Sequence, residues 1–195
     1  MMRLSDPIQG PVNEKEIEEL GDIVSNVNGV HEIKAETVGN IDSARTAIND
    51  SEIKTVGNIN GNIGIRHSNI GRCANIQAKH NAIIANSNVG IVGDIESGRG
   101  AILSSNVGQV GDIDSPDAIV DSYVGKTGNI TACNAITTGS NVGTVGNIEA
   151  SQFGIIWSKA NSIGNIKAGS AGLYSSKVES VENINSEGDG ISSRS

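Results

Sequence analysis

The chain has 195 residues, a formal net charge of −8 at pH 7 and only 2% aromatic residues. Nucleic-acid binding is not expected, because an acidic chain lacks the basic surface that phosphates require. The cysteines, Cys73 and Cys133, lie far apart in the sequence, without the spacing of a zinc site or a disulfide framework. The chain has no apolar run long enough for a transmembrane segment and no visible signal peptide.

The first 19 residues differ from everything that follows them. Asn13-Glu14-Lys15-Glu16 has the pattern of a helix capping box, and Ile17 and Leu20 follow it. These residues predict a short amphipathic helix. We therefore divide the chain into an N-terminal capping segment, 1–19, and one domain, 20–195.

From Leu20 onward the sequence repeats itself. The recurring unit is Val-Gly-Asn/Asp-Ile, and its last isoleucine returns every 17 to 19 residues. A regular period of this length indicates a repeat architecture. The ten anchor positions are Ile23, Ile41, Ile59, Ile76, Ile95, Ile113, Ile130, Ile148, Ile166 and Ile184.

Other positions of the repeat are equally regular. A small residue follows each anchor by two positions, and apolar residues follow by about seven, twelve and fifteen, for example Ile102, Val107 and Val110 after Ile95. Short β-branched runs separated by Gly, Asn and Ser predict short strands joined by tight bends. The sequence therefore predicts an all-β, single-stranded parallel β-helix (a β-solenoid) of about ten rungs, right-handed and triangular. Successive rungs should stack about 4.8 Å apart.

The Val-Gly-Asn/Asp-Ile unit has a physical interpretation in this fold. Glycine is expected to allow a bend, and the Asn or Asp before each anchor is expected to form a ladder of side chains that bond from rung to rung. The ladder positions are Asp22, Asn40, Asn58, Asn75, Asp94, Asp112, Asn129, Asn147, Asn165 and Asn183.

The rung from Ile95 to Ile113 resembles a rung of the bactofilins, with its Val110-Gly111-Asp112-Ile113 and a small residue two positions after each anchor. That resemblance implies a right-handed β-helix that polymerises into filaments. The residues Gly100–Ile102 and Ser105–Val107 also resemble the β-helix repeats of pectate-lyase-like and tail-spike proteins. Both resemblances run from Leu20 to Ser195, but the tails common in bactofilins and the catalytic motifs of lyases are missing. Six-residue spacing between Ile130 and Ile148 leaves a left-handed hexapeptide helix as the alternative.

One face of the predicted solenoid is apolar where solvent is expected. Because neighbouring side chains on a strand alternate, the residue after each core isoleucine of the second column should point outward. A continuous apolar column of this kind predicts an interface with another molecule, although loops could also tuck these residues in. The predicted interface residues are Ile84, Leu103, Val120, Thr137, Ile156 and Tyr174.

Two further groups of side chains are candidate sites. Asp94, Glu96, Asp112 and Asp114 flank two successive anchors, and calcium could relieve their mutual repulsion, although a solvated acidic face is the favoured interpretation because the usual loop spacing of calcium ligands is absent. Phe153, Trp157 and Tyr174 fall on adjacent rungs. They could form a sugar-binding face on the surface, or they could fill the core locally. No other cofactor is expected.

The regularity of the repeat favours a structural protein. An enzyme is expected to interrupt its scaffold with a long loop that carries the site, and no rung departs from the period by more than one residue. The expected function is a non-enzymatic, self-assembling solenoid that forms oligomers or filaments laterally or end to end. The alternatives are a carbohydrate-binding or carbohydrate-cleaving β-helix of a viral tail spike or surface, and an acidic rod that imitates DNA. The expected location is cytoplasmic or virion-associated.

Overall fold

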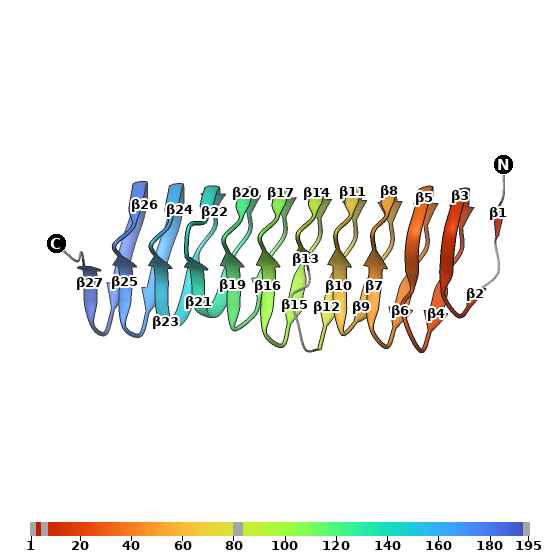
Figure 1. The fold of residues 1–195 in the computed structure, drawn as a ribbon. Helices are drawn as coiled ribbons and strands as arrows, with labels where there is room; N and C mark the ends of the chain where they lie inside the picture. Colours follow the sequence, from red (N-terminus) through yellow and green to blue (C-terminus); the bar gives the residue numbers. More distant parts are fainter. Residues whose placement is uncertain (1–2, 5–7, 80–83, 193–195) are drawn as a thin grey trace.

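The computed structural model describes residues 3–4, 8–79 and 84–192, and these form one straight rod of parallel strands. The 27 strands of the described residues belong to one continuous sheet that coils about the rod axis in about ten rungs. The two ends of the chain lie at opposite ends of the rod (Figure 1). The predicted parallel β-solenoid is therefore confirmed.

Each rung contains up to three short strands, which we call the anchor, second and third strands. Some neighbouring strands of one rung merge into a longer strand, as in β21 and β23. The separate anchor strands are β2 (Ile8–Gln9), β4 (Ile23–Ser25), β6 (Ile41–Ser43), β9 (Ile59–Gly61), β12 (Ile76–Ala78), β15 (Ile95–Ser97) and β18 (Ile113–Asp114). The separate second strands are β7 (Thr46–Asn49), β10 (Ile63–Arg66), β13 (Ile84–Ala85), β16 (Gly100–Leu103), β19 (Asp117–Val120), β25 (Ala171–Tyr174) and β27 (Asp189–Ser192).

The third strands and the merged strands complete the rungs. The separate third strands are β1 (Arg3–Leu4), β8 (Glu52–Val56), β11 (Asn69–Cys73), β14 (Asn88–Val92), β17 (Asn106–Val110), β20 (Tyr123–Thr127) and β22 (Asn141–Val145). The merged strands are β3 (Val12–Leu20), β5 (Val30–Val38), β21 (Ile130–Thr137), β23 (Ile148–Ile156), β24 (Lys159–Ala168) and β26 (Lys177–Ser186).

Like residues stack on like residues through the core. Ile95 pairs with Ile113, and Ile102 pairs with Ile119, one rung further along. The anchors from Ile23 to Ile166 are all buried, as are the second-column residues from Val30 to Leu173 that the structure describes. Because β-branched side chains fit a pleated and fully covered surface, these columns stabilise the rod without large aromatic residues.

The predicted N-terminal helix is wrong. The segment forms strand β3, in which Val12 pairs with Val30, Ile17 with Ala35 and Leu20 with Val38. Buried Ile17 and Leu20 stand three residues apart, which is the spacing of buried Ile53 and Val56 in the third strand β8. The strand pairing thus continues across the boundary that we expected at Leu20.

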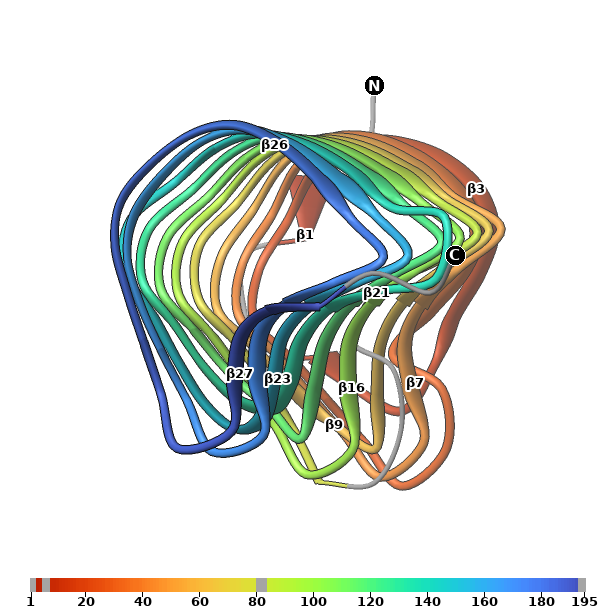
Figure 2. The same cartoon turned by 90° about the vertical axis from the view of Figure 1, so that its left-hand side faces the viewer.

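The cross-section is not a simple triangle. Viewed along the axis, the rungs outline a bent shape (Figure 2). The outline is re-entrant along the second strands and protrudes at the corner where each second strand leads into the third. The re-entrant side hollows the rod beside the second strands.

Candidate functional site

The corner between the second and third strands is built by one residue per rung in the left-handed backbone region. The φ values of these residues lie between 42° and 53°. Such a conformation is uncommon outside glycine, and Asn, Asp and short polar residues tolerate it best. The residues are Glu32, Asp50, His67, Asn86, Ser104, Asp121, Thr138, Trp157 and Ser175.

A column of serines follows the corner residues inside the rod. The hydroxyl of Ser105 donates to the carbonyl oxygen of Leu103 at 2.7 Å and accepts the backbone N–H of Ser87 at 3.2 Å. The same two bonds recur along most of the column, so each serine satisfies backbone groups that the sharp corner removes from the sheet. The sequence analysis missed this ladder, although a serine recurs at the required spacing. Its members are Ser51, Ser68, Ser87, Ser105, Ser122, Ser140, Ser158 and Ser176.

The predicted apolar column lies on the outer side of the second strands, beside this corner. Leu103 pairs with Val120, Val120 with Thr137, and Ile156 with Tyr174, and all of these side chains are half-buried. Ile84 is the exception, because it is fully buried between Ile65 and Ile102.

The misplacement of Ile84 has a local cause. The step from Ile76 to Ile95 is one of the longest in the repeat, so counting seven residues from the anchor assigned the core position to Ile83, which lies outside the described residues. Ala85 occupies the outward position instead, and it pairs with Leu103. The apolar column therefore consists of Ala85, Leu103, Val120, Thr137, Ile156 and Tyr174.

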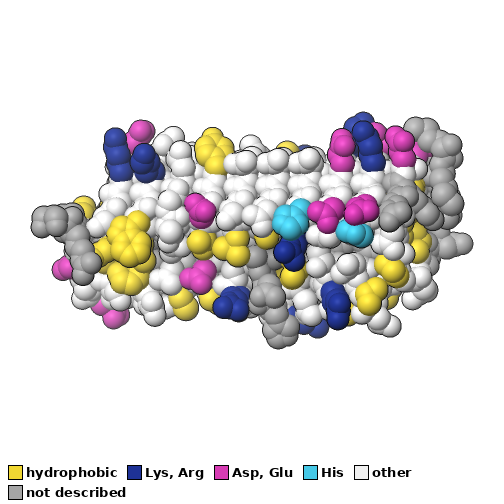
Figure 3. Space-filling model, in the orientation of Figure 1, with side chains coloured by type: hydrophobic (Ala, Val, Ile, Leu, Met, Phe, Trp, Pro, Cys, Tyr) yellow, Lys and Arg dark blue, Asp and Glu magenta, His cyan; other side chains and the backbone are white. Residues whose placement is uncertain are grey.

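The three predicted aromatic residues meet at the C-terminal part of the corner. The rings of Phe153 and Tyr174 lie edge to face with centroids 6.0 Å apart, and those of Trp157 and Tyr174 lie 6.1 Å apart in the same arrangement. Trp157 is 57% exposed, so the cluster is a surface feature and not a plug of the core. Figure 3 shows it as the large hydrophobic patch toward the C-terminal end.

A groove of about 600 Å³ runs along the corner beside this cluster. Trp157 lines it together with Asn141, Lys159 and Lys177. The two lysines pair in register on neighbouring third strands and are exposed. Among the described residues neither lysine forms an ion pair.

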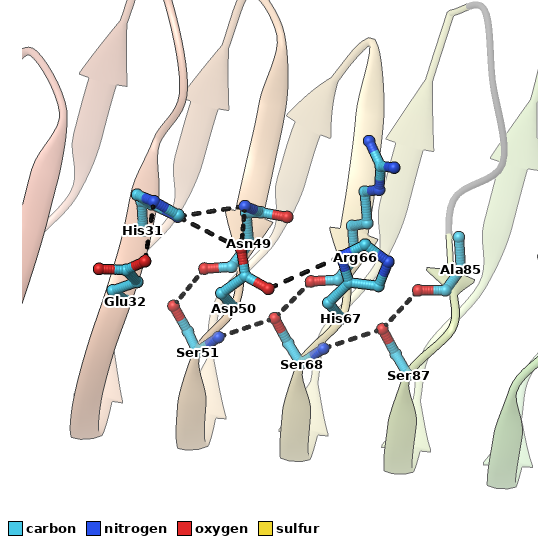
Figure 4. A network of polar contacts seen from close by, with 10 residues as sticks. All are labelled: His31, Glu32, Asn49, Asp50, Ser51, Arg66, His67, Ser68, Ala85 and Ser87. Carbon is cyan, nitrogen blue, oxygen red and sulfur yellow. Dashed lines mark hydrogen bonds and ion pairs between the residues drawn. The ribbon is translucent and has the colours of Figure 1, made fainter.

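The N-terminal part of the same corner carries a charged network instead (Figure 4). His31 Nδ1 lies 3.7 Å from one carboxylate oxygen of Asp50, and His67 Nδ1 lies 3.6 Å from the other. His31 Nε2 also lies 3.4 Å from Glu32 Oε1. Two histidines thus flank one carboxylate along the rod axis, and all of these groups are partly solvated.

The four carboxylates predicted to bind calcium lie on the outer side of the anchor strands, along a trough of about 800 Å³. Two of them already serve the rung-to-rung ladder, because Asp94 Oδ1 accepts the N–H of Asp112 at 2.8 Å and Asp112 Oδ1 accepts that of Asn129 at 2.6 Å. Glu96 accepts a bond from Gln77, and Asp114 is exposed. Within residues 3–4, 8–79 and 84–192 no three His, Cys, Asp or Glu side chains are arranged to hold a metal ion. Calcium binding stays a prediction.

The predicted Asn/Asp ladder is confirmed, with one refinement. In its main bond the backbone N–H of a ladder residue donates to the side-chain oxygen of the equivalent residue on the preceding rung, and both Asn and Asp supply such an oxygen. The glycine before it does not adopt a left-handed bend. At Gly111 a Cβ atom would collide with Oδ1 of Asp94, so glycine is needed for close approach.

The two cysteines lie in opposite surroundings. Cys73 occupies a core position between Val56 and Val92, and burial raises the pKa of its thiol to about 12. Cys133 is exposed, and both are free thiols.

Together these features define a parallel β-solenoid protein with a grooved corner. No protein-family model, curated protein or solved structure matches this chain. Within the described part of the chain, no helix has the length and apolarity needed to cross a bilayer.

Proposed function

We propose that the protein is a non-enzymatic structural solenoid that pairs side by side with a second copy of itself through the apolar column. The observation that carries this proposal is the continuity of the column. From Leu103 to Tyr174, five successive rungs present an uncharged and mostly apolar side chain on one line. A continuous, partly exposed apolar column of this length is unusual on a monomer and is typical of an association surface.

The net charge of the chain also favours this face as the association surface. Two copies that each carry a net charge of −8 repel each other, and the repulsion is weakest where the surface is uncharged. The neighbouring third-strand residues Asn106, Tyr123 and Asn141 are uncharged as well, and Asp121 lies at the corner between the two columns. Charge therefore opposes lateral association through this face only weakly.

The test is a measurement of mass by light scattering and sedimentation across a range of concentrations. We expect the parent to form dimers or larger assemblies, and to do so more readily at high salt, because salt screens the repulsion. Val120→Lys should raise the concentration needed for association at least tenfold. Thr131→Lys, on the exposed side of an anchor strand, is the matched control and should leave it unchanged.

Two outcomes contradict the proposal. A parent that is monomeric at every concentration removes self-association altogether. Association that Val120→Lys leaves intact assigns the contact to another surface, such as the ends of the rod, the other mode that the sequence suggests.

A second candidate function is carbohydrate binding, and the aromatic cluster favours it. Phe153, Trp157 and Tyr174 contact one another at the surface and border a groove, as a sugar-binding face requires. Mannotetraose titrated into the protein, with the tryptophan fluorescence as the signal, tests this candidate independently of association. The sequence contains one tryptophan, so the signal reports on Trp157 alone.

A further inference from the structure

Trp157 occupies a backbone position that does not suit it. Its φ is 46°, and in the other rungs this corner position holds Glu, Asp, His, Asn, Ser or Thr. A bulky side chain in the left-handed region is a conformational outlier, and such strain is concentrated at functional sites. The strained position directs the largest side chain of the chain outward at the corner, where it remains more than half exposed.

Two neighbouring aromatic rings support the surface around Trp157. Tyr174 contacts Trp157 edge to face, and Phe153 contacts Tyr174 in the same arrangement. Tyr174 and Phe153 both belong to paired second-strand positions, so the sheet fixes their backbones. A ligand that stacks on Trp157 therefore meets a surface that loses little conformational freedom on binding.

The groove next to this surface is positively charged within an acidic protein. Lys159 and Lys177 stand one rung apart, about 4.8 Å, and both line the groove with Trp157. Elsewhere on the third strands, Lys34 and Lys54 are matched by Glu52 and Glu36 at 3.6 and 2.5 Å. The lysines of the groove have no such partner among the described residues, so an anion from outside can serve as one.

We infer that the corner groove formed by Trp157, Lys159 and Lys177 binds an acidic oligosaccharide, whose sugar rings stack on Trp157 while its carboxylates pair with the two lysines. This inference rests on the second candidate function and adds the charge class of the ligand. Asn141, which also lines the groove, supplies an amide that can donate to or accept from sugar hydroxyls.

The chemistry of the groove distinguishes this ligand from its competitors. A neutral sugar leaves two lysines without counter-charge, whereas a cationic ligand is repelled by them. A single-stranded nucleic acid can also stack on an aromatic ring, but its closely spaced phosphates require a long basic track. The corner does not supply such a track, because the acidic residues Glu32, Asp50 and Glu52 line its N-terminal half.

The experiment compares β-1,4-linked tetramannuronic acid with β-1,4-linked tetramannose by calorimetry and by the fluorescence of Trp157. We expect the acidic tetramer to bind at least tenfold more tightly than the neutral one, to change the tryptophan emission, and to lose affinity as salt is raised. The double variant Lys159→Gln/Lys177→Gln should remove the preference for the acidic tetramer, so that the two tetramers bind with equal affinity. Lys126→Gln, on an adjacent part of the third strands, is the matched control and should bind as the parent does.

Trp157→Asn tests the stacking surface and should abolish binding of both tetramers. Asparagine suits a left-handed position, so this variant should retain the fold, which circular dichroism checks. Equal affinity for the two tetramers overturns the acidic inference and leaves carbohydrate binding in place. If neither tetramer binds, both the acidic inference and carbohydrate binding are overturned. If a thymidine octanucleotide binds more tightly than the acidic tetramer, the groove is assigned to nucleic acid instead.

Discussion

Two ladders of polar side chains run along the rod, and they differ in burial. The serine ladder lies inside the corner between the second and third strands, where Ser105 is 5% exposed and Ser140 is 1% exposed. The Asn/Asp ladder lies on the outside, with Asp94, Asp112 and Asn129 all exposed. Both ladders have the same structural role, because in each a side-chain oxygen accepts a hydrogen bond from a backbone N–H of a neighbouring rung.

The difference shows how burial sets the free-energy cost of losing such a bond. An exposed N–H that loses its partner can bond to water, whereas a buried one cannot. Loss of a bond in the serine ladder should therefore cost much more than loss of a bond in the Asn/Asp ladder. Cys73 extends the comparison to a buried group that can ionise.

The largest expected effect is that of high pH on Cys73. Burial raises the pKa of this thiol from 9.0 to about 12, so the folded state holds the proton more tightly than the unfolded state does. The resulting stabilisation is complete below about pH 9 and is lost as the pH rises toward 12, by about 1.4 kcal/mol per pH unit. Urea unfolding at several pH values should show this slope in the parent but not in Cys73→Val. Parallel curves for the two proteins would show that Cys73 does not ionise on unfolding.

The next effect tests the serine ladder directly. Ser105→Ala removes the acceptor of the Ser87 N–H and the donor to the Leu103 carbonyl, and each buried group left unpaired costs about 1–3 kcal/mol. We expect the free energy of unfolding to fall by about 2–4 kcal/mol in urea titrations. Ser151→Ala, at an exposed serine, is the control and should change it by less than about 0.5 kcal/mol. A Ser105→Ala effect as small as that of the control would refute the structural role of the ladder.

The smallest effect belongs to the exposed ladder. Asp112→Leu removes the oxygen that accepts the Asn129 N–H, and we expect a loss of about 1 kcal/mol. Asp112→Asn keeps an oxygen at the same place and should differ from the parent by less than about 0.5 kcal/mol. Should the leucine variant cost as much as Ser105→Ala, burial would not be the property that separates the two ladders.

Much of the fold could be predicted from the sequence because isoleucine recurs at every anchor and mostly β-branched residues recur at the other core positions. The pairing of Ile95 with Ile113 and the Asn/Asp ladder both follow from the period alone. The strand at Val12–Leu20 was missed because its outward residues are charged, so a helix-capping pattern concealed a further rung. The spacing of Val12, Ile17 and Leu20 could have indicated this rung, because it matches the spacing of Val30, Ala35 and Val38.

The candidate site was only partly predictable. The apolar column followed from alternation along a strand, but the longer rung after Ile76 shifted Ile84 from the surface to the core. The groove could not be foreseen, because it depends on the left-handed backbone at residues such as Trp157 and Ser175. These residues share no side-chain type, so the column carries no signature in the sequence.

Neighbouring rungs supply the pairing of every strand, and the two ends of the chain lie at opposite ends of the rod. Tension applied between those ends is therefore borne by the outermost rung alone, and the rungs detach one after another. Each rung of about 18 residues releases about 60 Å of extended chain. A molecule pulled in this way lengthens in equal increments at a nearly constant force, and so behaves as an extensible tether.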